Sequence, residues 1–277
     1  MRTDIAKEAR ENFPELQGIK EEKIVHDGFE RLRITVQTET AAKQLDKPIG
    51  IYSTVSFPQN TLLSEDTRAT CAEEIANELT VLLPKHGEIL VVGLGNRYIT
   101  ADALGTKTVE NVLVTRHVRN RFSDVLPKHT RSVAAFCAGV LGVTGMETVE
   151  VVSALCDKVR PEAVLVVDSL AAGNAAHIGA VVQMNDTGIS PGAGIGNYQP
   201  SLNRDTIGVP VIAIGMPLVI GIDALLAGTD SISVDKGYSV TPKDIDVLVS
   251  NASKLLSLSI NTALYRKNHA SLKKLLQ

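Results

Sequence analysis

The sequence predicts an α/β fold in which helices cover a mostly parallel central sheet. Two stretches, ILVVG at 89–93 and AVLVV at 163–167, are unbroken apolar runs, which is typical of parallel strands buried on both faces. Aromatic residues make up only 4% of the 277 residues and tryptophan is absent, so Val, Ile, Leu and Ala must build the core. With 44% hydrophobic residues, the chain is long and apolar enough to bury a large core.

The first third of the chain predicts a hairpin between two helices. Asp27-Gly28 separates two segments of β-prone residues, which is the sequence signal for a tight hairpin turn. We expect region 20–57 to form either a small accessory sheet or an extension of the main one. The expected strands are 23–26, 29–37 and 49–57, and the expected helices are 4–13 and a longer one that begins at Ser64 and ends before Pro84.

The remaining two thirds alternate between strand and helix patterns. Thr241-Pro242-Lys243-Asp244 predicts the start of a C-terminal helix of roughly 25 residues, because it offers a capping hydroxyl, a first-turn proline and an acid. Since no repeat or low-complexity segment interrupts the pattern, we expect residues 1–277 to form a single domain. The other expected strands are 88–93, 132–136, 163–167, 178–184 and 209–215, and the other expected helices are 106–119 and 147–159.

Charge and cysteine content argue against several function classes. The net charge is −3 and no basic block occurs, so we expect no direct binding of nucleic acid. Cys71, Cys137 and Cys156 lie far apart and form no CxxC pair, which argues against a zinc site or a disulfide framework. The polar N-terminus is unlike a signal peptide, and no apolar run approaches the ~20 residues of a membrane span, so we expect an intracellular protein without membrane contact.

Two aspartates follow the two apolar strands, and they are the candidate catalytic residues. Asp168 comes directly after the strand at 163–167, and Asp102 lies in the loop after the strand at 89–93. Because parallel strands deliver their carboxyl ends to one edge of a sheet, both carboxylates should meet there. Two carboxylates that share a proton provide one acid and one base, which together can activate a water molecule. Asp102 could instead cap a helix.

Two glycine-rich loops are candidates for substrate binding. Gly93, Gly95 and Asn96 form a tight turn after the first strand; the third glycine of a dinucleotide fingerprint is missing, so we favour a substrate-binding turn over a cofactor phosphate site. The second loop is either a plain connector or a substrate clamp, and its candidate residues are Gly192, Gly194, Gly196 and Asn197. The sequence contains neither a GxSxG elbow nor an HExxH motif, which disfavours serine-hydrolase and zincin chemistry.

Several motifs resemble those of the germination protease family, the spore endopeptidases that degrade small acid-soluble spore proteins. The resemblance covers most of the chain, and the motifs occur in the family's order. They are RTDIAKEA at 2–9, VVGLGN and TADALG within 91–105, TRH at 115–117, GVTGMET at 142–148, VVDSLAA at 166–172, DTGISPGAGIGN at 186–197 and IGVPVIAIGMP at 207–217.

The resemblance implies a fold and a mechanism. It implies an α/β sandwich like that of the hydrogenase-maturation proteases, and an atypical aspartic endopeptidase whose catalytic pair falls on Asp102 and Asp168. No cofactor and no metal are implied. It further implies small acid-soluble spore proteins as substrates, a location in the spore core within the cytoplasm, and a homo-oligomer, for which we expect a tetramer.

The resemblance also implies a zymogen that cleaves its own N-terminus. The family processes itself within an RTD-(Leu/Ile)-A sequence, which here begins at residue 2, so cleavage is expected between Asp4 and Ile5. The removable segment would then be only Met1–Asp4. Ordinary helix-start chemistry is the alternative reading of this segment. A second departure is the short 218–240 segment, which is longer in better-known members.

Two other functions remain open at the level of sequence. One is a metal-dependent maturation-type protease of the same fold, in which acid and histidine side chains hold nickel. The other is a non-catalytic binding module that has kept the cleft.

Overall fold

The computed structural model describes residues 3–192, 200–226 and 238–276. Its framework is a nine-stranded sheet with the strand order β1-β2-β3-β7-β8-β6-β4-β5, and β9 pairs with β8. The four neighbours β8, β6, β4 and β5 are parallel, whereas every other pairing is antiparallel. The strands are β1 (Ile19–His26), β2 (Phe29–Val36), β3 (Gly50–Ser56), β4 (Ile89–Gly93), β5 (Val133–Cys137), β6 (Ala163–Ala172), β7 (Val181–Asn185), β8 (Val211–Gly221) and β9 (Ser239–Val240).

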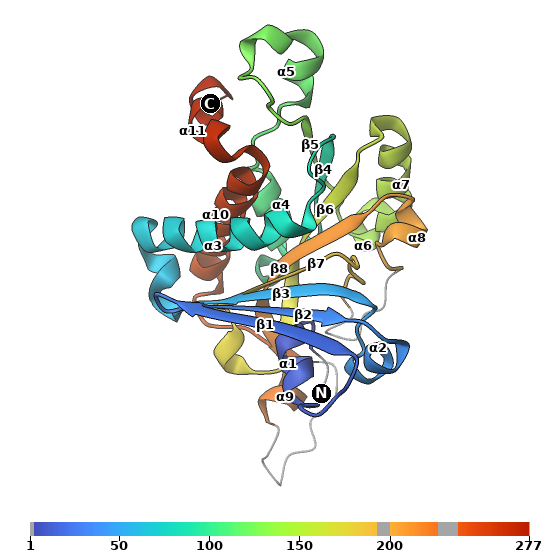
Figure 1. Ribbon diagram of the computed structural model, residues 1–277, viewed down its shortest axis with the longest axis vertical. Helices are drawn as coiled ribbons and strands as arrows, with labels where there is room; N and C mark the ends of the chain where they lie inside the picture. The colour runs from blue at the N-terminus through green and yellow to red at the C-terminus, as the bar shows by residue number, and fades with distance from the viewer. Residues whose placement is uncertain (1–2, 193–199, 227–237, 277) are drawn as a thin grey trace.

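Helices pack on both faces of the parallel strands (Figure 1). Helices α3, α4 and α10 cover one face and form the larger core with the sheet, while α7 and α8 cover the other face. The predicted α/β architecture is therefore confirmed: helices cover both faces of a sheet whose strands β8, β6, β4 and β5 are parallel. The helices are α1 (Ala6–Glu11), α2 (Glu39–Leu45), α3 (Glu65–Leu82), α4 (Leu104–Val109), α5 (Arg116–Arg121), α6 (Leu141–Thr144), α7 (Thr148–Val159), α8 (Arg204–Ile207), α9 (Ile222–Leu225), α10 (Ile245–Tyr265) and α11 (His269–Leu276).

The predicted hairpin is present, and it extends the main sheet. Asp27 and Gly28 both have positive φ, 48° and 82°, as a two-residue turn requires when it matches the twist of the strands. Strand β3 then pairs with β7, which joins the hairpin to the parallel strands through continuous hydrogen bonding. Helices α1 and α2 pack on one face of this extension and bury Leu32, Ile34 and Tyr52.

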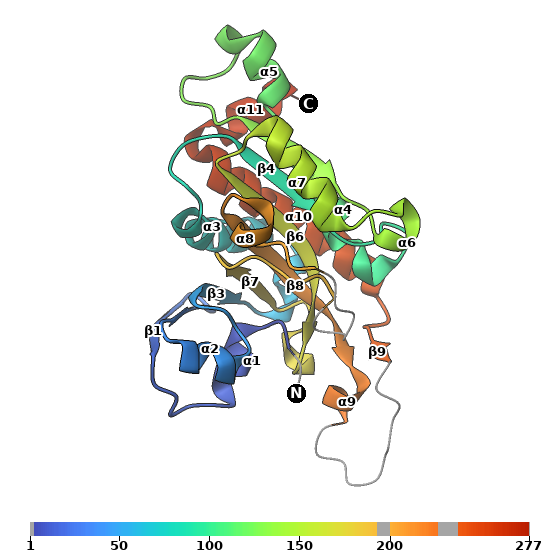
Figure 2. The same cartoon turned by 90° about the vertical axis from the view of Figure 1, so that its right-hand side faces the viewer.

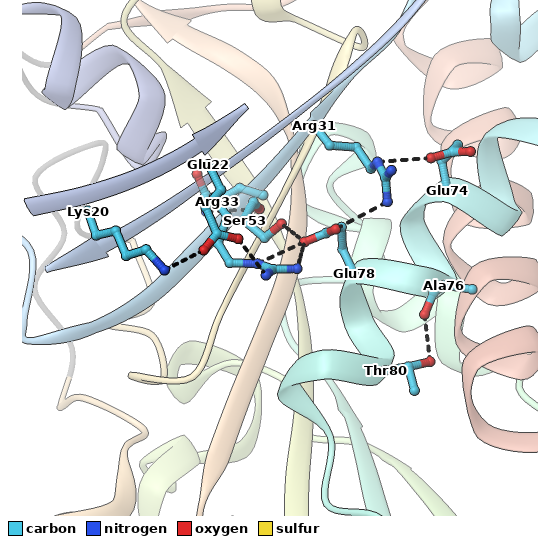
Figure 3. Close-up of polar contacts among 10 residues, drawn as sticks. Lys20, Glu22, Arg31, Arg33, Ser53, Glu74, Ala76, Glu78 and Thr80 are labelled. Carbon is cyan, nitrogen blue, oxygen red and sulfur yellow. Dashed lines mark hydrogen bonds and ion pairs between the residues drawn. The ribbon is translucent and has the colours of Figure 1, made fainter. Parts of the chain in front are cut away.

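A buried ion network attaches the opposite face of the extension to α3 (Figure 3). Glu78 of α3 is only 5% exposed, and it accepts hydrogen bonds from Arg33 of β2 at 2.9 Å and from Ser53 of β3 at 2.7 Å. Arg31 contacts Glu78 at 3.4 Å and Glu74 at 3.2 Å, which brings a second cation to the network. Because a buried carboxylate needs such partners, the network fixes how the hairpin lies on the helical layer.

The structure corrects several predicted elements. The helix expected at 106–119 is wrong, because α4 and α5 are separate short helices, and Asn261 of α10 bonds the backbone of the intervening segment at Leu113 and Asn111. The C-terminal helix begins at Ile245 rather than at the predicted opener. Strands β6 and β8 continue past their predicted ends because they pair with each other as far as Ala172 and Ile220. Helices α2 and α11 were not predicted.

Among the described residues, no helix combines the length and apolar character needed to cross a membrane.

Candidate active site

The two candidate aspartates lie near the carboxyl end of β4, one of them on the neighbouring parallel strand β6 and the other in the segment that follows β4. In the β4–β6 pair, Gly93 is opposite Val167, so Asp168 follows on β6 just where β4 ends. The chain leaves β4 through Leu94, whose amide donates to the Val167 carbonyl at 2.9 Å. It then returns through the single turn Thr100–Asp102, which places Asp102 over the same sheet edge.

The turn after β4 binds Asp102 directly. The Asn96 amide donates to Oδ2 of Asp102 at 2.6 Å. Gly95 has φ of 91°, and a Cβ there would lie 1.9 Å from the Asp102 carbonyl oxygen, so this position requires glycine. In the described contacts, the turn therefore positions the aspartate. Whether Gly93, Gly95 and Asn96 also touch a substrate stays a prediction.

Asp168 lies within a strand and not at its end, which corrects the sequence-based placement. Strand β6 continues to Ala172, and Asp168 pairs with Gly215 of β8. The carboxyl group is buried, with the residue 5% exposed, and Oδ1 accepts a hydrogen bond from the Ser169 amide at 2.8 Å. Gly215 was missed by the sequence analysis. A Cβ at that position would lie 2.6 Å from the Asp168 carbonyl oxygen, so a glycine within an apolar strand was the available signal.

The surroundings of the two carboxyl groups shift their pKa values to different extents. The pKa of Asp168 lies well above its ordinary value, first because the carboxyl group is buried and then because the negative charge of Asp102 is nearby. The hydrogen bond from the Ser169 amide opposes this shift, and the charge of Asp4 adds to it. The pKa of Asp102 is also raised by burial, while the hydrogen bond from Asn96 opposes the shift. The arrangement therefore favours a proton on Asp168 and the charge on Asp102.

The N-terminal segment lies beside the end of β6, the strand that carries Asp168 (Figure 2). Asp4 bonds Ala171 of β6 twice: its amide donates to the Ala171 carbonyl at 3.1 Å, and its Oδ2 accepts from the Ala171 amide at 2.8 Å. Ile5 is extended and fully buried, and α1 begins only at Ala6. Asp4 and Ile5 therefore lie against the end of β6, the strand that carries Asp168, and the bond between them is outside the helix.

Glu8 fixes α1 to the turn that follows β6. Its carboxylate accepts hydrogen bonds from the Gly173 amide at 2.7 Å, from the Asn174 amide at 3.0 Å and from the hydroxyl of Thr3, and it contacts Nδ1 of His177 at 2.5 Å. Burial alone would raise the pKa of Glu8, but these bonds, led by that of His177, lower it below its ordinary value. Glu8 was not predicted from the sequence.

The second glycine-rich loop starts and ends near the N-terminal segment. Ile189 and Leu202 form a bridge, and the hydroxyl groups of Ser190 and Ser201 are 2.6 Å apart, which closes the loop at its base. Gly192 has a positive φ of 72°. The other predicted clamp residues, Gly194, Gly196 and Asn197, lie outside the described residues.

A cavity of about 680 Å³ adjoins the N-terminal segment. Its walls include Asp4, Lys47, Leu170, Ser190 and Gly215. Neither Asp102 nor Asp168 is among the described residues that line it, but Gly215 is the strand partner of Asp168. The cavity therefore lies beside the stretch of β6 and β8 that contains Asp168, on the side where Asp4 binds.

Within the part of the chain that the structure describes, no group of three or more histidine, cysteine, aspartate or glutamate side chains is placed to hold a metal ion.

Comparison with known proteins decides the family. The family model for germination protease matches residues 1–238. The chain belongs to the germination protease family. It is 33% identical to the germination protease of Clostridium perfringens (strain 13 / Type A), with 95% of each chain covered. It is 35% identical to that of Caldanaerobacter subterraneus subsp. tengcongensis, which covers 95% of this chain and 94% of the relative.

Two further matches cover less of this chain. The germination protease of Geobacillus sp. (strain WCH70) is 38% identical over 84% of this chain and 66% of the relative. The solved structure of a [NiFe] hydrogenase maturation protease, HycI from Thermococcus kodakarensis KOD1, aligns with a TM-score of 0.40 at 16% identity, and covers 68% of this chain and 98% of that one. Membership of the germination protease family confirms the resemblance seen in the sequence and makes this protein a protease that acts in spore germination.

Proposed function

We propose that this germination protease is an endopeptidase that cleaves small acid-soluble spore proteins by means of a water molecule activated by Asp102 and Asp168. The observation that carries the proposal is the placement of Asp168 on β6 next to the end of β4 and of Asp102 in the turn that follows β4, so that burial and the nearby charge of Asp102 both raise the pKa of Asp168. One ionised and one neutral carboxyl group are the two partners that such hydrolysis requires.

The burial of each group assigns its role. Ionised Asp102 takes a proton from the water as the water oxygen attacks the carbonyl carbon of the peptide. Neutral Asp168 donates a hydrogen bond and then its proton to the carbonyl oxygen, which stabilises the tetrahedral intermediate. When the intermediate collapses, the C–N bond breaks, Asp102 gives its proton to the leaving nitrogen, and Asp168 takes a proton from a hydroxyl group that stays on the carbon and becomes part of the new carboxyl group. The carboxyl pair is then ready for the next peptide bond.

The position of the N-terminal segment supports self-processing of a zymogen. The bond between Asp4 and Ile5 lies before α1, in an extended stretch held against β6 close to Asp168. Cleavage there would release Met1–Asp4 and leave Ile5 as the new terminus. N-terminal sequencing after activation should then begin at Ile5, and an active enzyme that still begins at Met1 or Arg2 would contradict this step.

The decisive experiment compares three asparagine variants. Asp102→Asn and Asp168→Asn should each reduce cleavage of a purified small acid-soluble spore protein by more than about 1,000-fold, because each removes a group that exchanges a proton. Asp157→Asn, on the exposed side of α7, is the matched control and should cleave like the wild type. Near-normal turnover by either active-site variant would reject the assignment of that aspartate. Folding is checked by circular dichroism.

A further inference from the structure

The N-terminal segment lies in a groove along β6, and each of the residues 4–6 makes a separate contact with that groove. The Asp4 amide donates to the Ala171 carbonyl, as the amide of an added strand would, and the Asp4 carboxylate accepts from the Ala171 amide in place of a main-chain carbonyl. Ile5 is fully buried in an apolar pocket formed by Leu170, Val181 and Ile189. The groove therefore recognises an acidic residue followed by a branched apolar one.

The next residue meets a fixed hydrogen-bond acceptor. The Ala6 amide donates to Oε1 of Gln183 at 2.9 Å. Gln183 is only 3% exposed, and its amide nitrogen donates to the Met184 carbonyl at 2.9 Å, so its orientation is set by the sheet rather than by the segment. An acceptor held in this way can receive the main-chain amide of any peptide that follows the same path.

Lys47 supplies the charge on the other side of the segment. It follows α2, and its Nζ donates to the Thr3 carbonyl at 3.0 Å. Burial lowers the pKa of Lys47, while the negative charges of Asp4, Asp46 and Glu8 oppose that shift. The same proximity acts on Asp4: burial raises its pKa, while the Ala171 amide and the charge of Lys47 lower it. The lysine and the acidic side chain thus offset part of each other's burial cost.

We propose that Lys47 and the Leu170–Val181–Ile189 pocket are the specificity-determining groups of this protease: Lys47 sets the charge preference at the position that Asp4 occupies, and the pocket binds the apolar side chain that follows it. The inference rests on the proposed endopeptidase function, and the chain's own Asp4-Ile5 occupies the place that a substrate takes. Lys47 attracts an acidic residue in the position of Asp4. A neutral or basic residue there leaves the charge of Lys47 without a partner, so the site also disfavours such peptides.

The first test measures specificity in the full-length protein. The probe is a synthetic peptide that copies residues 2–10, together with versions carrying Asp4→Asn or Asp4→Lys. The wild type should cleave the original peptide about 10-fold to 100-fold faster than the Asn version, as expected for loss of a hydrogen bond or ion pair to a charged group. Lys47→Gln should bring this ratio of kcat/KM values close to one, and Lys47→Glu should favour the Lys version.

The matched control is Lys43→Gln, which removes a lysine from the exposed face of α2. It should leave the ratio between the peptides unchanged. A merely structural role for Lys47 would lower cleavage of all three peptides together and leave their ratio intact. That result would overturn the proposal.

The second test separates this inference from the proposed function, because it requires no cleavage. Binding of the fluorescently labelled peptides is followed by anisotropy on chains carrying Asp168→Asn. Adding Asp4→Lys places a second cation beside Lys47, and it should displace the chain's own segment and increase peptide affinity. Further addition of Lys47→Gln should remove the preference for the acidic peptide.

The outcomes of the two tests are distinct. Lys47-dependent binding without cleavage by the wild type would reject the proposed endopeptidase function and retain the recognition site. If the variant with Asp168→Asn and Asp4→Lys binds no peptide, or binds the acidic and neutral peptides equally, the proposal that Lys47 and the pocket determine specificity is wrong.

Discussion

Replacement of Gly105 by alanine tests whether close packing of α4 against the sheet sets the position of Asp102. Gly105 is the second residue of α4, three positions after Asp102. A Cβ on Gly105 would lie 2.3 Å from the Val167 carbonyl oxygen and 2.5 Å from that of Leu94, both of which are backbone atoms. Since ordinary contact begins at 3.4 Å, α4 must move by about 1 Å to accommodate the methyl group.

This displacement should affect both stability and catalysis. Insertion of a methyl group into a packed interior costs about 1–3 kcal/mol in the free energy of unfolding. A shift of this size in a catalytic group lowers turnover by roughly 10-fold to 100-fold, and Asp102 should move with the helix that follows it. Urea unfolding followed by circular dichroism measures the first quantity, and kcat/KM on the peptide of residues 2–10 measures the second.

Gly142→Ala is the matched control, because a Cβ at Gly142 meets no described atom within 4 Å. Gly142 lies in the single-turn helix α6. Its replacement should leave cleavage unchanged, and the free energy of unfolding should equal that of the wild type to within about 0.5 kcal/mol or exceed it slightly. If Gly105→Ala unfolds and cleaves like the wild type, α4 is not held by this contact, and the argument that its packing positions Asp102 is refuted.

Three other predictions follow from buried charge. Asp168→Asn should stabilise the fold at about pH 7, since a raised folded-state pKa means that the unfolded chain ionises first; this gain should shrink as the pH falls towards the ordinary value of 3.8, and urea unfolding at several pH values measures it. Cleavage should follow a bell-shaped pH profile, with an acid limb set mainly by Asp102 and an alkaline limb set mainly by Asp168. Because both pKa values are raised, both limbs should lie above the ordinary range of aspartate. A profile whose two limbs lie in that ordinary range would contradict the assignment of Asp102 and Asp168 as the catalytic pair. Glu78→Gln should lower the free energy of unfolding by about 1.5–3 kcal/mol, because Arg31 and Arg33 lose a buried charged acceptor. Glu74→Gln, which touches Arg31 alone at a more exposed position, should cost less than about 1 kcal/mol; equal effects of the two changes would show that burial of the network does not matter.

The parts of the fold that were predictable are those in which a local pattern and the tertiary contacts agree. The Asp27-Gly28 turn is an example, since its residues favour the positive φ values that the hairpin imposes. The strand at 89–93 is another, because an apolar run of this length fits a position buried on both faces. Neither element depends on a distant partner for its identity, so the sequence alone specifies it.

The errors arose where a distant segment decides the structure. The predicted helix at 106–119 is broken because Leu113 donates its amide to Asn261 on α10, a contact that no local pattern announces. Strand β6 was expected to end at Val167, since a carboxylate seldom continues a buried strand, yet pairing with β8 carries it past Asp168. Periodicity cannot reveal either partner.

The candidate site was predictable only in part, for the same reason. Asp102 and Asp168 could be found because each follows an apolar run, and the edge of a parallel sheet gathers such residues. Lys47 belongs to no motif, and Glu8 lies in the RTDIAKEA segment without any local sign of its role; the importance of the two residues comes from contacts with Thr3 and with the turn after β6. The resemblance drew attention to Asp4 and Ile5, but it did not indicate which residues receive them.

The extension of β6 through Asp168 accounts for the chemistry of the pair. A carboxyl group at a frayed strand end would be hydrated and ionised, whereas one held between paired strands loses water on all sides. Gly215 permits this continued pairing, because any side chain there would collide with the Asp168 backbone. Asp102 lies instead in a turn, where the Asn96 amide stabilises its charge. The difference between strand and turn thus sets a neutral acid beside an ionised base. An acidic residue bound against Ala171 strengthens the asymmetry, because its negative charge raises the pKa of Asp168 further.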